Sequence, residues 1–358
     1  MTVKIDDLTL LILAHNNPAY LARSVDYYAR LDCEKIIVDS STSPTYAPDR
    51  VPDGYDYCHL PLDYFTKLRS VAATISNPHV LCAGCDDFFV PESVQQATAY
   101  LRDHPTHVAV NGHHIGFRAA GHQYAFFLKH SQEFLHLAAR GANENVFARL
   151  NLAITPPYGL IYSVVRSAVF KDIIATPYTN AAKIHYYTFY DRYIQILLAI
   201  MGDVKMLPAL FAARSVTARP QTASTAHTQF RDAMTHWPQG AMDEYVRMLI
   251  SLATLLQRER GVPLNEGMSL IDGVLRRSMW SQMSWNRDDP AQLAEIGRRA
   301  DEIDARLSQN GGLLVPRRDR FGMPFPEAER LFPVYANPEY VREIAACLER
   351  HPVETTEP

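Results

Sequence analysis

Apolar runs alternate with amphipathic helical segments over the first third of the chain, and this alternation limits the fold more than any other feature. The runs at 8–14, 35–38 and 79–83 are short and apolar, as expected of buried strands. The segments 18–31 and 91–102 have apolar residues at helical spacing, and each begins with a proline, which suits a first helical position. Strands that alternate with helices predict βαβ units and a mainly parallel sheet.

The rest of the chain divides into a mixed part and a helical part. Further strands are expected at 55–60, 108–110, 160–165 and 204–207, the last as a short edge strand, and further helices at 63–75 and 190–201. The segment 113–141 is aromatic and favours irregular or antiparallel structure. After a polar loop at 220–236, helical spacing appears at 242–258, 264–277 and 290–307, and no strand is expected. We therefore predict an α/β domain over residues 1–235 and a helical region over residues 236–358.

Composition narrows the classes of function. The 358 residues carry a net charge of -4, which argues against a protein that coats nucleic acid. Five cysteines are too few and too scattered for a disulfide framework and fit a reducing cytoplasm. The run 8–14 follows Asp6 and Asp7 rather than basic residues, so it does not resemble a signal peptide. No apolar run approaches the ~20 residues of a membrane helix. We expect a cytoplasmic protein without a transmembrane segment or a nucleic-acid partner.

Polar side chains follow the predicted strands directly. His15 and Asn16 follow the first strand, Asp39 ends the second, and Asp86 and Asp87 follow the fourth. Ligands of open α/β sheets bind at the carboxyl ends of the strands. Two adjacent carboxylates repel each other, and a hard cation such as Mg²⁺ would relieve the repulsion while it binds substrate phosphates. The pattern indicates a metal and diphosphate site. The alternative is that the two carboxylates belong to an acidic turn that only caps the next helix.

Four segments, in this order, resemble the family-2-type glycosyltransferases, which have a GT-A fold. They are the strand, turn and helix at 8–28, the strand and acidic end at 36–41, the basic helix position Lys67 followed by two alanines, and the run from Cys85 to Phe88. The resemblance covers roughly residues 8–112, is looser to 215 and offers no motif beyond 235. It implies a three-layer α/β/α domain. Relatives with a three-aspartate motif would have an aspartate where this chain has Cys85.

The resemblance also implies roles for individual residues. The nucleotide would be bound by His15, Asn16, Asp39, Lys67 and Asp86, and Mg²⁺ or Mn²⁺ would be bound by Asp87 with Asp86. An inverting transfer needs one general base, for which Asp191 is the first candidate and Glu144 the second. Each role has a plain structural alternative: Asp39 as a turn aspartate, Lys67 as a solvated helix cation, and Asp191 as an N-cap or first-turn residue.

The resulting prediction is a metal-dependent, inverting glycosyltransferase. Its donor would be a nucleotide-diphosphate sugar, UDP-linked by default, and its acceptor a glycan, a lipid-linked sugar, a protein or a small molecule. A homo-oligomer is compatible with the C-terminal helices. Two alternatives stay open. A nucleotidyltransferase shares the layers and the metal, but the usual Gly-rich basic loop after the first strand is missing. A catalytically degenerate GT-A binding module would explain Cys85.

Overall fold

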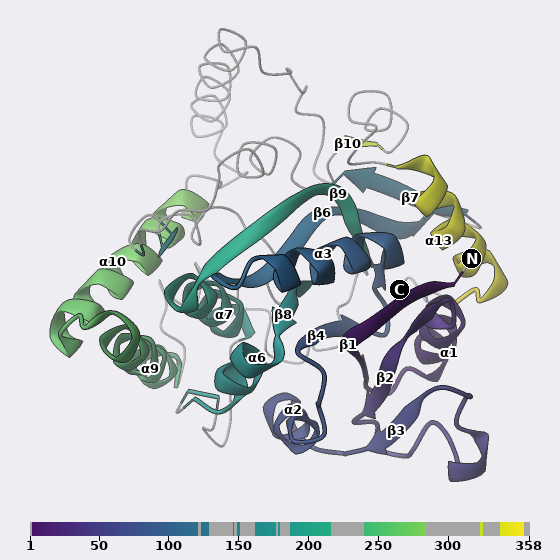
Figure 1. Cartoon of the computed structure of the whole chain (residues 1–358), viewed down its shortest axis with the longest axis horizontal. Helices are drawn as coiled ribbons and strands as arrows, with labels where there is room; N and C mark the ends of the chain where they lie inside the picture. The colour runs from purple at the N-terminus through teal and green to yellow at the C-terminus, as the bar shows by residue number, and fades with distance from the viewer. Residues whose placement is uncertain are drawn as a thin grey trace, which may run out of the picture.

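The computed structural model of the chain describes residues 2–120, 123–128, 146, 149–150, 162–176, 178–179, 187–215, 240–283, 323–324 and 337–353. One sheet organises these residues (Figure 1). Its strands are β1 (Val3–Ala14), β2 (Leu31–Asp39), β3 (Asp56–His59), β4 (His79–Gly84), β5 (Phe88–Phe89), β6 (His107–Ala120), β7 (Gln123–Leu128), β8 (Val164–Arg166), β9 (Asp203–Ser215) and β10 (Met323–Pro324). The helices are α1 (Pro18–Tyr28), α2 (Tyr64–Ala72), α3 (Pro91–Asp103), α6 (Ser167–Ile174), α7 (Tyr187–Met201), α9 (Ala241–Arg260), α10 (Leu264–Met283) and α13 (Pro338–Arg350).

The first half of the sheet is parallel, as the strand and helix alternation predicts. Strand β1 pairs in parallel with both β2 and β4, and β2 pairs in parallel with β3. The second half is different, because β8 runs antiparallel between β4 and β6, and β7 runs antiparallel to β6. Strand β9 is parallel to β6 and antiparallel to β5. Within the segment 113–141, which was expected to be irregular or antiparallel, the described residues form the antiparallel pairing of β6 with β7.

Helices cover both faces of the sheet, so the predicted three-layer α/β/α arrangement is confirmed. Successive residues of a strand point to opposite faces. Leu11 of β1 accordingly joins the core with α2, α6 and α7, whereas Leu10 and Ile12 join the core with α1, α3 and α13. All three side chains are fully buried, which explains why β1 is an uninterrupted apolar run rather than an alternating one.

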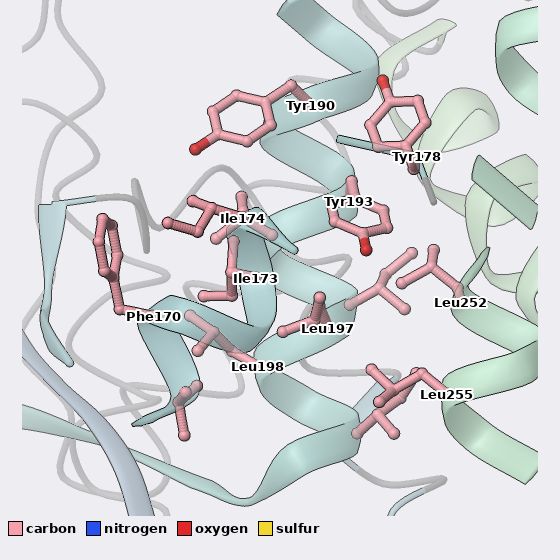
Figure 2. Close-up of a cluster of buried hydrophobic side chains, with 14 of the residues drawn as sticks. Phe170, Ile173, Ile174, Tyr178, Tyr190, Tyr193, Leu197, Leu198, Leu252 and Leu255 are labelled. Atoms are coloured by element: carbon pink, nitrogen blue, oxygen red, sulfur yellow. The ribbon is translucent and has the colours of Figure 1, made fainter. Parts of the chain in front are cut away.

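The C-terminal helices are divided between the two faces (Figure 1). Helices α9 and α10 extend the α7 core, in which α7 lies between the apolar side chains of α6 and the leucines of α9 (Figure 2). Two hydrogen-bonded pairs add to this contact: Tyr178 Oη donates to Glu244 Oε1 at 3.0 Å, and Tyr193 Oη lies 3.2 Å from Ser251 Oγ. Helix α13 packs instead against α1. None of the described helices is long and apolar enough to cross a membrane.

Several element boundaries differ from the sequence prediction. The strand expected at 204–207 is present, but its predicted length and edge position are wrong, because β9 has 13 residues and pairs with both β6 and β5. A proline normally ends an interior strand, but here the β6 to β9 register shifts between Asn111 and His113, around Pro208. Helix α6 was not expected, nor was the short β10 after the helical region began. The predicted helix 290–307 and the domain boundary near 235 lie outside the described residues.

Candidate functional site

The carboxyl ends of three parallel strands meet at one edge of the sheet. In the strand register, Ala14 at the end of β1 pairs with Asp39 at the end of β2, and Leu13 pairs with Gly84 at the end of β4. The residues that follow these strand ends were the predicted nucleotide and metal residues. The parallel pairing of β1 with both neighbours therefore places them along a single edge.

The turn after β1 is hydrogen-bonded to the turn after β2. His15 Nδ1 lies 3.0 Å from the carbonyl oxygen of Ser40, and the backbone N–H of Asn16 donates to Ser41 Oγ at 2.7 Å. The backbone N–H of Thr42 donates in return to Asn16 Oδ1 at 3.0 Å. Asn16 has a φ of 51°, a left-handed conformation that asparagine tolerates better than most residues. His15 and Asn16 thus lie beside the end of β2, as predicted, with exposed side chains.

Asp39 organises the loop that follows β2. Its Oδ1 accepts the backbone N–H of Ser41 at 2.8 Å, and its Oδ2 accepts the N–H of Thr45 at 3.1 Å and the hydroxyl of Tyr57 at 2.7 Å. Burial raises the pKa of Asp39, but the hydrogen bonds from Ser41, Tyr57 and Thr45 outweigh it and bring the pKa to about 2. The turn-aspartate role is therefore present in the structure, and nucleotide binding by Asp39 stays a prediction.

Helix α2 brings a buried ammonium to the same edge. Lys67 is 5% exposed, its Nζ donates to Ser40 Oγ at 2.9 Å, and it lies 5.8 Å from the centroid of the Tyr64 ring. Burial lowers the pKa of Lys67, while the negative charge of Asp39 acts in the opposite direction. The alternative that Lys67 is a solvated helix cation is wrong.

The turn after β4 carries Asp86 and Asp87. The backbone N–H of Asp87 donates to the carbonyl oxygen of Gly84 at 3.1 Å, which closes the turn. Asp87 is buried: its Oδ1 accepts the backbone N–H of Ser215 at 2.9 Å, and its Oδ2 lies 3.7 Å from Arg214 Nε. Arg214 itself stacks on Tyr162, 3.9 Å from the ring centroid. The end of β9 therefore supplies a cation beside Asp87.

The two carboxylates turn toward a common point above Gly84. A Cβ at position 84 would stand 2.8 Å from Asp86 Oδ1 and 3.6 Å from Asp87 Oδ2, so glycine leaves room for both oxygens. Burial raises the pKa of Asp86, and the charges of Arg214 and Arg23 act against this rise. Among the residues that the structure describes, no three His, Cys, Asp or Glu side chains form a group that could hold a metal ion. Two carboxylates with substrate phosphates still make a suitable ligand set for Mg²⁺.

Cys85 and Cys82 do not add to such a ligand set. Burial, followed by the charges of Asp86 and Asp87, raises the pKa of Cys85 to about 12, and burial raises that of Cys82 to about 12. Both thiols are therefore protonated at neutral pH, and a neutral thiol is a poor ligand for a hard cation. The departure from the three-aspartate pattern leaves Asp86 and Asp87 as the carboxylates of the turn.

Asp191 lies on α7, close to the start of α2. Its neighbour Tyr190 packs against Phe65, with ring centroids 4.5 Å apart, and against Tyr64, at 5.6 Å. Because α7 begins at Tyr187, Asp191 is in the second turn and is not the N-cap residue. Its side chain and the whole of Glu144 lie outside the described part of the chain, so the base assignment stays a prediction.

Sequence reasoning missed the partners of these residues. The hydroxyl of Tyr57 reaches Asp39 from β3, a contact that depends on a strand pairing invisible in the sequence. The place of Arg214 beside Asp87 depends on the full length of β9, which the sequence does not indicate. The hydroxyl-rich run after Asp39 is the one available signal, since Ser40 and Ser41 bind both neighbouring elements.

Solved structures have the same three-layer fold. The chain resembles S. aureus TarS residues 1–349 in complex with UDP-GlcNAc, with a TM-score of 0.51 and 15% identity over 96% of this chain and 91% of that one. The same protein in complex with UDP gives a TM-score of 0.49 and 13% identity over 84% of this chain and 78% of that one. At this identity the likeness shows the fold alone. A scan against models of protein families and a search of curated proteins give no match.

The low pKa of Asp39 predicts how stability changes with pH. Because the folded-state pKa of about 2 lies below the ordinary value, the carboxylate stabilises the fold above about pH 4 and loses that contribution as the pH falls toward 2. We expect Asp39→Asn to lower the free energy of unfolding by about 2 kcal/mol at pH 7. Urea titrations at pH 7 and at pH 3 measure the difference, which should shrink at the lower pH. Asp53→Asn, at an exposed position, is the control. An equal loss at both pH values would contradict the assigned hydrogen bonds.

Proposed function

We propose that the chain is a glycosyltransferase that uses a nucleotide-diphosphate sugar, with a UDP-linked sugar as the first candidate donor. The observation that carries this proposal is the convergence of Asp86 and Asp87 above Gly84, next to the edge that holds Asp39 and Lys67. The fold likeness to TarS with bound UDP-GlcNAc supports the choice of donor.

The donor nucleotide would lie across the carboxyl ends of β1 and β2. Lys67 is the main cation available there, because an ammonium has three donors and the hydroxyl of Ser40 is its one hydrogen-bond partner among the described residues. A phosphate oxygen would satisfy the remaining donors. His15 and Asn16, with exposed side chains, would contact the nucleoside from the turn after β1. Asp39 would act by shaping the loop that holds the base, in addition to any direct contact.

Mg²⁺ or Mn²⁺ would be bound by Asp87 and Asp86 through oxygen ligands of the kind these ions prefer. Such an ion stabilises the charge that develops on a diphosphate leaving group. Arg214 contributes a positive charge next to Asp87, with its Nε 3.7 Å from Asp87 Oδ2. Ser215 holds the other oxygen of Asp87 through its backbone N–H. Asp86 would contact the donor from the same turn, beside Asp87.

The chemical step would be an inverting displacement. The acceptor hydroxyl attacks the anomeric carbon, the bond to the diphosphate oxygen breaks, and the proton of the hydroxyl passes to a carboxylate. We assign this base role to Asp191, because α7 reaches the start of α2, the helix of Lys67, through the Tyr190 contact with Phe65. We place the reaction in the cytoplasm, since all five cysteines are free thiols.

A binding module without turnover is the second candidate. It is favoured by the protonated Cys85 thiol at a position where relatives with three aspartates carry a further carboxylate. Both the glycosyltransferase and the binding module are expected to bind the donor, but only the glycosyltransferase is expected to transfer the sugar.

Metal-linked donor binding tests the assignment of Asp87. A ligand at a hundredfold excess over its Kd stabilises the native state by about 2.7 kcal/mol. We expect UDP with Mn²⁺ to raise the melting temperature of the wild type more than UDP alone does, and Asp87→Asn to lose the Mn²⁺-dependent part. The substitution keeps an acceptor for the N–H of Ser215. Asp103→Asn removes an exposed charge elsewhere and is the control. A full Mn²⁺ effect in Asp87→Asn would refute the metal site.

The role of Asp191 is tested by separating binding from turnover. Loss of a general base lowers the rate by about 10²–10⁴-fold, whereas the donor affinity should stay within about twofold, or ~0.5 kcal/mol. We therefore expect Asp191→Asn to bind UDP normally and to lose sugar transfer and donor hydrolysis, both measured as UDP release. Asp172→Asn on α6 is the matched control. Near-normal turnover in Asp191→Asn would place the base elsewhere.

A further inference from the structure

Helix α1 contains a buried arginine that lacks hydrogen-bond partners. Arg23 is 1% exposed, and its Nε and Nη2 donate to no acceptor within the part of the chain that the structure describes. A buried polar group without a partner costs free energy, and a buried charge costs more. Arg166, by contrast, is only partly buried and donates to three backbone carbonyl oxygens. The arginine in α1 therefore needs an explanation that packing does not give.

Aromatic rings account for only part of the environment of Arg23. Its Cζ lies 4.7 Å from the centroid of the Tyr20 ring and 5.3 Å from that of Phe88. Cation–π contacts of this kind contribute roughly 0.5–2 kcal/mol, but they leave in-plane N–H donors unsatisfied. Burial lowers the pKa of Arg23, and the nearby groups that act against this effect include Tyr124, Tyr20 and Asp86. The side chain is thus pre-positioned for an anion.

The guanidinium lies beside the turn that carries Asp86. Helix α1 packs directly against this turn. The hydroxyl of Tyr28 donates to the carbonyl oxygen of Asp87 at 3.2 Å and accepts the N–H of Phe89 at 3.0 Å. Arg23 is slightly more than one helical turn before Tyr28, next to Phe88. Its positive charge also acts on the carboxyl group of Asp86.

Two buried cations therefore approach the site from opposite faces of the sheet. Lys67 comes from α2, whose core lies on one face, and Arg23 comes from α1, whose core lies on the other. Lys67 donates a hydrogen bond to the hydroxyl of Ser40 at the end of β2. The side-chain contacts of Arg23 among the described residues are with the rings of Tyr20 and Phe88. The Tyr20 ring lies against Arg23, and Tyr124 is close enough to influence its pKa. Both tyrosines are only half-buried, so the α1 face of Arg23 is bordered by partly exposed side chains.

We propose that Arg23 is the anion-binding residue of a second substrate subsite, on the α1 face of Asp86, that takes a phosphate or carboxylate group. This subsite rests on the proposed function, since the diphosphate of the donor would be held from the α2 face by Lys67. The anion would then belong either to the transferred sugar or to the acceptor. Tyr20 and Tyr124 supply hydroxyls at the rim of the subsite that can share the anion.

The test uses the full chain and inorganic phosphate as the probe. The melting temperature is measured with increasing phosphate, with and without saturating UDP and Mn²⁺, for the wild type, Arg23→Met and Arg23→Lys. We expect phosphate to raise the melting temperature of the wild type in both conditions, Arg23→Met to lose this shift, and Arg23→Lys to keep part of it. Arg23→Met preserves the apolar stem and removes an unpaired buried charge, so it should melt no lower than the wild type without ligand. Arg102→Met, at an exposed arginine, is the control.

Two results would overturn the subsite. An equal phosphate shift in the wild type and Arg23→Met would show that Arg23 binds no anion. A phosphate shift that disappears once UDP is saturating would assign the anion to the donor diphosphate. The UDP and Mn²⁺ shift of the wild type tests the proposed function separately, because the phosphate series without UDP does not depend on it. If the shift persists under UDP, glucuronic acid and glycerol phosphate as added probes distinguish an acidic sugar from a phosphorylated acceptor.

Discussion

The parallel pairing of β1 with both β2 and β4 is the constraint on which the site depends. It fixes the ends of the three strands at one level, so the turns at His15, Asp39 and Asp86 have to meet. The pairing in turn depends on the apolar side chains of β1, which are buried on both faces of the sheet. A slip of one residue would move each of these side chains to the other face and separate the polar turns.

Charge is distributed unevenly along this edge. The carboxylate of Asp39 is occupied by three donors of its own loop, so its charge serves local structure first. Asp87 is compensated in part by Arg214, while Lys67 and Arg23 have no carboxylate as a hydrogen-bond partner among the described residues. A ligand with several negative charges would complete such a site, and a nucleotide-diphosphate sugar has this character. In the proposed transfer reaction these preorganised cations would stabilise the charge that develops on the leaving group without reorganisation.

The sequence predicted the parallel half of the sheet and the residues at its edge, because hydrophobic periodicity and strand-end position are local properties. It failed where the structure depends on distant contacts. The full length of β9 is not predictable, because a proline such as Pro208 normally ends a strand. In the structure, a register shift in the pairing of β9 with β6 accommodates Pro208. The contact of Tyr57 with Asp39 and the isolation of Arg23 result from tertiary packing, which no spacing rule encodes. The GT-A resemblance predicts a role for Asp86 and Asp87 but gives no sign of Gly84, which leaves room for both carboxylate oxygens.

Hydrogen–deuterium exchange with and without UDP and Mn²⁺ tests most directly whether the nucleotide binds at the common edge of β1, β2 and β4. The account predicts slower amide exchange on ligand addition in residues 14–17, 39–46 and 84–88, which belong to the three turns. The open groove lined by Lys4, Gln95 and Arg102 lies apart from these turns and should exchange at an unchanged rate. Protection confined to that groove, or unchanged exchange in all three turns at saturating UDP, would contradict the account.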